Sequence, residues 1–181
     1  MKSRLWPRIY ISSINFMSTM RRSFQNRRKM AVTNMDGPIA ELVSNTNHKT
    51  LAIWAADCAE RALPFFEEKC PKDTRPRKAI EACRAWARTG VFRMADVRKT
   101  SLAAHAAARD VIEDDAARSA ARAAGHAMAT AHVRTHAIAA AIYAVTAVRD
   151  ATNSSDADAP TKKERNWQYR HLLELVGKSR E

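Results

Sequence analysis

Glycine and proline are scarce in this sequence. Its 181 residues include 4 glycines and 6 prolines, so the chain lacks the residues that build the many tight turns of a β protein. Alanine instead dominates the middle of the chain, which is typical of long, closely packed helices. We therefore predict an all-α fold: a compact bundle of about five helices with an alanine-rich helical hairpin.

Cysteine is also rare. The 3 cysteines, Cys58, Cys70 and Cys83, are odd in number and form no C-x-x-C pair, which argues against a disulfide framework. Each lies at an apolar helix position or at a predicted helix end. This usage favours a reducing, cytoplasmic compartment.

Sequence motifs of catalysis are mostly missing. The chain has no glycine-rich phosphate loop, no G-x-S-x-G nucleophile elbow and no H-E-x-x-H pair, so the common signatures of phosphoryl transfer, ester hydrolysis and zinc proteolysis are absent. We expect a binding protein rather than an enzyme, and we expect no cofactor.

Long apolar runs are lacking as well. The longest run near the start, around residues 9–17, is broken by Ser12, Ser13 and Asn15. It is too short and too polar to span a membrane or to form a good secretory core. We therefore expect no membrane partner.

Acidic residues are absent from residues 1–30, which hold eight of the twelve net positive charges. A nucleic-acid-binding domain carries such charge on a folded face, so we expect nucleic-acid binding only through this leader. We interpret residues 1–35 as a basic, disordered leader, included because the translation start was assigned too far upstream. The arginine and serine content of this leader also fits a targeting signal.

Helical patterning begins at residue 36. We expect the bundle core at 36–151, a polar linker at 152–159 and a C-terminal helix at 160–181 that docks on the bundle. Local residues predict several helix boundaries: Pro64 should kink or stop one helix, Gly90 should end the next, and Asp114 should help to begin another. In the last helix an i, i+3, i+4, i+7 stripe predicts the docking face. The stripe consists of Tyr169, Leu172, Leu173 and Val176.

Three histidines lie in the alanine-rich stretch 123–141: His126, His132 and His136. In one continuous helix, His132 and His136 would share a face at a spacing that can supply two imidazoles to a metal. If Thr135 is instead an N-cap, the stretch becomes two helices, which ordinary helix lengths favour. We expect hydrogen-bonded structural histidines rather than a metal site, which would need further ligands.

Charged residues cluster at two places that could form a site. Asp57 and Arg61 are an i, i+4 pair, and the run DTRPRK places Asp73, Arg75 and Arg77 at a helix start. One interpretation is a salt-bridged surface with a helix cap. The other is a binding rim, because arginine forks suit carboxylates and phosphates.

Three longer stretches resemble a known family. They are LAIWAADCAERALPFFEEKCPKDTRPRKAIEACRAWARTG, RKTSLAAHAAARD and AARAAGHAMATAHVRTHAIAAAIYA. Together they resemble the bacterial immunity proteins of the Imm-5-like group, a helical family linked to toxin systems. The resemblance spans about residues 49–148 and leaves residues 1–35 outside.

The resemblance implies a small cytoplasmic protein that binds a protein toxin and blocks it. Separately, the alanine-rich helix faces could pair two copies of the chain into a homodimer. Candidate residues for partner binding, or for a buried polar network that fixes helix register, are Asp57, Arg61, Asp73, Arg75, Arg77, His105, Arg109, His126, His132 and His136. The alternative function is a helical metal-dependent enzyme. Its ligands would come from His105, His126, His132, His136 and Asp57.

Overall fold

The computed structural model describes residues 35–152 and 157–179. These residues form seven helices and no strand, with bounds α2 (Asp36–Ser44), α3 (His48–Lys69), α4 (Arg75–Thr89), α5 (Met94–Asp110), α6 (Asp115–Ala129), α7 (His136–Asp150) and α8 (Asp158–Lys178). The all-α prediction is confirmed. The prediction of about five helices is wrong, in part because residues 36–44 form a separate short helix. The predicted leader, apart from Met35, and the middle of the predicted linker lie outside the described residues.

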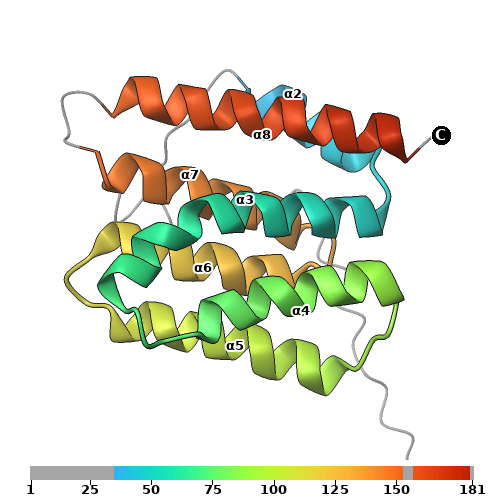
Figure 1. Ribbon diagram of the computed structural model, residues 1–181. Helices are drawn as coiled ribbons and strands as arrows, with labels where there is room; N and C mark the ends of the chain where they lie inside the picture. The colour runs from blue at the N-terminus through green and yellow to red at the C-terminus, as the bar shows by residue number, and fades with distance from the viewer. Residues whose placement is uncertain (1–34, 153–156, 180–181) are drawn as a thin grey trace, which may run out of the picture. The chain divides into compact units, whose positions relative to one another are not determined.

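Helix α6 is the centre of the bundle. It contacts α3, α4, α5 and α7, and in Figure 1 it runs between α8 at the top and α5 at the bottom. Most of its residues are buried and are small, chiefly alanine. The residues of α6 outside the buried set lie on one stripe: Asp115, Arg118, Arg122 and His126.

Several helix boundaries follow the sequence predictions. Gly90 ends α4 with a left-handed φ of 70° and donates its N–H to the Trp86 carbonyl at 2.8 Å. Asp114 caps α6 by accepting a hydrogen bond from the Ala117 N–H at 2.9 Å. Pro64 does not stop α3, which continues to Lys69, because fully buried side chains on both sides of the proline hold the helix in place.

The alanine-rich hairpin is present as α6 and α7, separated by the turn at residues 130–135. Thr135 precedes α7 as predicted, but its side chain makes no capping hydrogen bond. The turn is held instead by the first residue of α3, His48, and by Thr46 in the segment between α2 and α3. The His48 Nε2 lies 2.5 Å from the Thr130 carbonyl, and Arg134 donates to the Thr46 carbonyl at 2.5 Å.

Helix α8 docks through a polar face, so the predicted apolar stripe is wrong in detail. Leu172 is fully buried, but the adjacent Leu173 is 44% exposed. The buried residues of α8 are Thr161, Glu164, Arg165, Gln168 and Leu172. Apolar periodicity could not identify this face because most of its residues are polar.

Hydrogen bonds satisfy this polar face. The Gln168 side chain donates to the Ala141 carbonyl at 3.0 Å and accepts from Arg165 at 2.7 Å. The indole N–H of Trp54 donates to the Gln168 carbonyl at 2.8 Å. Arg165 also pairs with Asp36, which lies on α2, at 2.8 Å. Among the described residues, every buried side-chain nitrogen and oxygen has a hydrogen-bond partner.

All three cysteines are free, and Cys58 and Cys83 are buried. The Cys83 thiol lies 3.0 Å from the Ala127 carbonyl of α6, so it tethers α4 to the central helix by a weak hydrogen bond. No helix in the described part of the chain is long and apolar enough to cross a membrane.

The neighbouring leucines of α8 provide a test of its orientation. We expect Leu172→Ala to lower the free energy of unfolding by about 2–5 kcal/mol, because it removes a fully buried side chain. Leu173→Ala is the matched control and should cost less than about 1 kcal/mol. Urea denaturation of both variants measures the difference. Equal losses would contradict the observed docking face.

Candidate functional site

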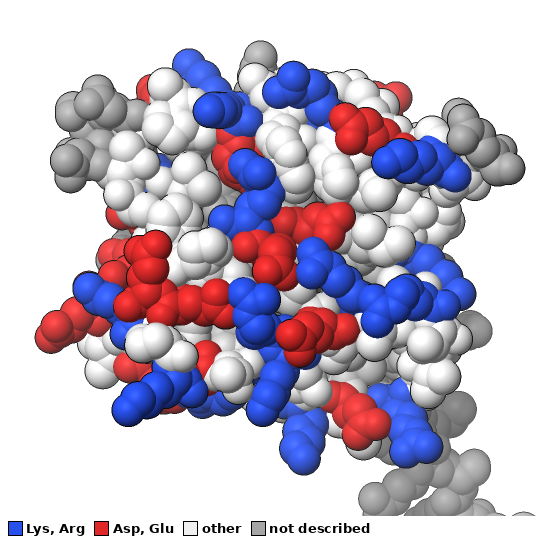
Figure 2. Space-filling model, viewed as in Figure 1, with Lys and Arg blue, Asp and Glu red and all other residues white. Residues whose placement is uncertain are grey.

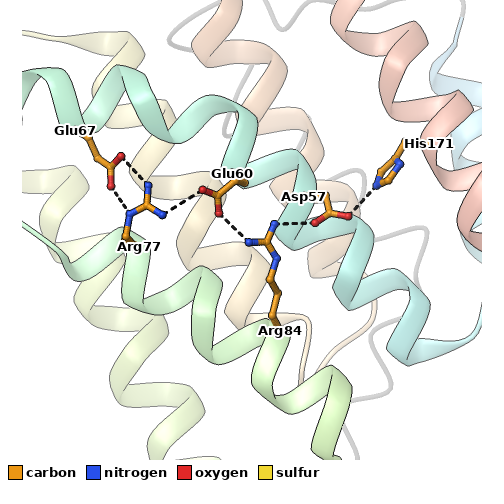
Figure 3. Close-up of polar contacts among 6 residues, drawn as sticks. All are labelled: Asp57, Glu60, Glu67, Arg77, Arg84 and His171. Carbon is orange, nitrogen blue, oxygen red and sulfur yellow. Dashed lines mark hydrogen bonds and ion pairs between the residues drawn. The ribbon is translucent and has the colours of Figure 1, made fainter.

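Five charged side chains and one histidine from α3, α4 and α8 form a polar ladder (Figure 3), which we call the ladder. Its members in order are Glu67, Arg77, Glu60, Arg84, Asp57 and His171. Arg77 bridges Glu67 at 2.5 Å and Glu60 at 3.2 Å. Arg84 bridges Glu60 at 3.0 Å and Asp57 at 2.8 Å. The ladder ends where the His171 Nε2 meets Asp57 at 2.8 Å.

The ladder arises from complementary stripes on two adjacent helices. Asp57, Glu60 and Glu67 fall on one face of α3, while Arg77 and Arg84 fall on one face of α4. The Arg77 guanidinium lowers the pKa of the Glu67 carboxyl through their hydrogen bond. Each arginine of the ladder therefore already has carboxylate partners.

Arg61 has a partner other than Asp57, although the i, i+4 spacing suggested that pair. Its guanidinium binds the buried carboxylate of Glu164 on α8, with the shortest contact at 2.8 Å. The same guanidinium lies 4.0 Å above the Trp167 ring. The hydrogen bonds that Arg61 donates to the Glu164 carboxylate raise the pKa of Arg61, so this pair links α3 to α8.

The run at the start of α4 is salt-bridged. The Asp73 carboxylate accepts hydrogen bonds from both the backbone N–H and the guanidinium of Arg75, which lowers the pKa of Asp73. Arg75 also pairs with Asp110 at the end of α5 at 2.6 Å. Acidic and basic side chains interleave across the whole face that α3 and α4 form, as Figure 2 shows.

Four histidines meet away from the ladder, in a histidine cluster made of His105, His126, His132 and His136. His126 is central: its ring centroid lies 4.8 Å from that of His105 and 5.2 Å from that of His136. The Nδ1 atoms of His126 and His136 are 3.1 Å apart, so one donates and the other accepts. His132 packs 5.3 Å from His136.

Two neighbours complete the cluster. The Tyr143 ring stacks on His126 at 5.2 Å with an interplanar angle of 9°. Arg122 donates to the Tyr143 hydroxyl at 3.3 Å. The cluster therefore joins α5, α6 and α7 on the solvent-facing stripe of the central helix.

Partial burial holds the pKa values of three rings of the cluster, those of His105, His126 and His136, below their usual range. Desolvation lowers the pKa of His126 to about 3, helped by the positive potential of the neighbouring histidines and Arg122. Desolvation also lowers the pKa of His136 to about 4. It lowers the pKa of His105, with smaller contributions from Arg122 and the exposed Arg109. Neutral imidazoles at neutral pH can pack closely and share hydrogen bonds without repulsion.

The predicted residues thus fall into separate groups. Asp57 and Arg77 are in the ladder, Arg61 and Arg75 are in adjacent ion pairs, and the histidines form their own cluster. The metal hypothesis would need the Asp57 carboxylate to lie beside the histidine cluster. It instead binds Arg84 and His171. In the described ranges, no group of three or more His, Cys, Asp or Glu residues is placed to hold a metal ion.

Gly125 is a site residue that sequence reasoning missed. A Cβ at this position would lie 2.7 Å from the His105 Cε1 and 2.9 Å from its Nδ1, so only glycine lets the His105 ring lie against α6. The sequence did hold a clue, because a glycine inside an alanine-rich helix costs stability without a packing reason. Arg84, Glu60 and His171 were also missed, although the acidic and basic stripes of α3 and α4 could have indicated the ladder.

The contact between Gly125 and His105 predicts a coupled pair of substitutions. In a His105→Ala background, Gly125→Ala should stabilise the protein by about 1 kcal/mol through helix propensity. With His105 present, the same change forces the ring aside, and overpacking of about 1–3 kcal/mol should cancel or reverse the gain. A double-mutant cycle by urea denaturation tests this; an equal gain in both backgrounds would refute the contact.

The lowered histidine pKa values predict a loss of stability in acid. The unfolded chain takes up protons near pH 6.5, whereas folded His126 and His136 resist protonation down to about pH 3 and 4. Stability is therefore full above pH 6.5 and falls as the pH is lowered toward 4. Between pH 7.5 and 5.5, wild type should lose about 1 kcal/mol more than His126→Gln.

Urea denaturation at the two pH values provides the measurement. Tyr143→Phe is the control, because it keeps the stacked ring and changes no group that titrates in this range. It should show the pH dependence of wild type. If His126→Gln shows that dependence too, the buried neutral state of His126 is wrong.

Comparison with known proteins identifies a family. The model of the Imm-5 like putative immunity protein family matches residues 41–175, a range that runs from α2 into α8 and contains both the ladder and the histidine cluster. No curated protein and no solved structure matches the chain. The match covers well over half of the 181 residues, and the chain therefore belongs to the Imm-5 like putative immunity protein family.

Proposed function

We propose that this protein neutralises a protein toxin by binding it. The family match over residues 41–175 carries the proposal, because it covers nearly all of the described helices. Inhibition by binding needs a rigid, complementary surface rather than reacting groups. The ladder and its neighbouring ion pairs link α3, α4, α5 and α8, which supports the scaffold that would carry such a surface.

In this proposal the histidine cluster is a packing element. Its rings join α5, α6 and α7, and the Gly125 contact fixes the position of His105. Mutually hydrogen-bonded polar groups of this kind specify a unique helix register. We further propose that the protein acts in the bacterial cytoplasm, where its three free thiols would stay reduced.

Co-expression tests the proposed function. Reading frames that neighbour this gene are first expressed singly, to find any whose product arrests growth. Co-expression with this protein should then restore growth, and the two proteins should co-elute as a stable complex in size-exclusion chromatography. Controls are the empty vector and an unrelated helical protein. If no toxic neighbour is relieved, or if growth returns without a complex, toxin neutralisation by binding is wrong.

A further inference from the structure

The connection between α4 and α5 exposes a run of large apolar side chains. Val91 is 67% exposed, Phe92 is 43% exposed, and Met94 at the start of α5 is 50% exposed. These three residues lie within four positions of the chain, so their side chains share one region of the surface. Together with Arg93 and Arg98 we call them the loop patch. Exposed apolar clusters with a polar rim are characteristic of interaction sites.

The rim of the loop patch is basic. Its exposed charged residues are Arg88, Arg93, Asp96, Arg98 and Lys99. Within the described part of the chain none of these residues is in an ion pair. The contrast with the ladder is direct: Arg77 and Arg84 are engaged by carboxylates of α3, whereas Arg93 and Arg98 remain available to a partner.

We propose that the loop patch is the surface on which the toxin docks, and that the toxin presents acidic side chains around an apolar depression. This inference rests on the proposed function and adds the site and the chemistry of the partner. Phenylalanine, methionine and arginine are the residue types that interface centres favour. Phe92 and Met94 are the expected anchors, and Arg93 and Arg98 are the charges that steer and orient the toxin.

Charge distinguishes the toxin from the other possible occupants. In a symmetric dimer built on this patch, Arg93 and Arg98 of one copy would face the same basic region of the other, which like-charge repulsion disfavours. Residues 1–30 carry eight basic residues and no acid, so they too would be repelled. An acidic protein surface is the occupant whose charge complements the patch.

Paired variants test the inference. Phe92→Ala with Met94→Ala should remove the apolar anchors, and Arg93→Glu with Arg98→Glu should reverse the charge. The apolar control is Ile112→Ala, since Ile112 is 78% exposed and lies just beyond the C-terminal end of α5, away from the loop patch. The charge control is Lys162→Glu with Lys163→Glu on the exposed face of α8. Thermal melts confirm that each variant folds.

The probe is the toxin identified by co-expression, made inactive by a substitution in its own active site. Calorimetry should show about 100-fold weaker binding for each patch variant, as truncation of anchor residues produces. The controls should bind within about threefold of wild type. Wild-type binding should also weaken as salt rises, and the charge-reversed variant should lose that dependence.

The outcomes separate the two proposals. If wild type relieves a toxin and the patch variants bind that toxin as wild type does, the docking site is wrong and the proposed function stands. If wild type relieves no toxin, both proposals fail. If sedimentation shows a wild-type dimer that the patch variants abolish, a second copy occupies the patch and the inference is overturned.

Discussion

Close approach of other helices to α6 is the constraint on which the molecule depends. The buried surface of α6 is mostly alanine, so α3, α4, α5 and α7 can all pack against it. Because α3 and α4 both rest on α6, their outer faces lie close enough for the Arg77 and Arg84 forks to reach carboxylates. Because α5 and α7 also rest on α6, the histidine rings meet beside it. Larger side chains on α6 would separate both clusters.

The polar groups of this protein are of three kinds: surface ion pairs, buried hydrogen bonds and charges without an ion-pair partner. The ladder lies at the surface, where ion pairs add little stability but hold side chains in fixed positions. The contacts beneath α8 are buried, and there Gln168 and Arg165 must be satisfied or the helix would be costly to dock. Around the α4–α5 connection, by contrast, charges are left open. We interpret this uneven distribution as a division between structure and recognition.

Features governed by local periodicity could be predicted from the sequence. The fold class, the hairpin break before His136, the stop at Gly90 and the cap at Asp114 all depend on neighbouring residues. The contact between Asp57 and His171 could not, because His171 lies 114 positions away along the chain and no local pattern links α3 to α8. The docking face of α8 was missed for a related reason: its polar residues are buried only because distant groups satisfy them. Pro64 does not stop α3, because packing on both sides of the proline holds the helix together.

The polar face of α8 also matters while the chain is being synthesised. Among the described helices α8 is made last, so α2–α7 exist for a time without it. Until α8 docks, the Trp54 indole N–H, the Ala141 carbonyl and the Arg61 guanidinium lack their α8 partners. Water can solvate all three groups. An uncovered apolar groove would attract other nascent chains, whereas the surface that receives the polar face of α8 exposes hydrogen-bonding groups that water can satisfy. When α8 docks, protein hydrogen bonds replace the water on these groups.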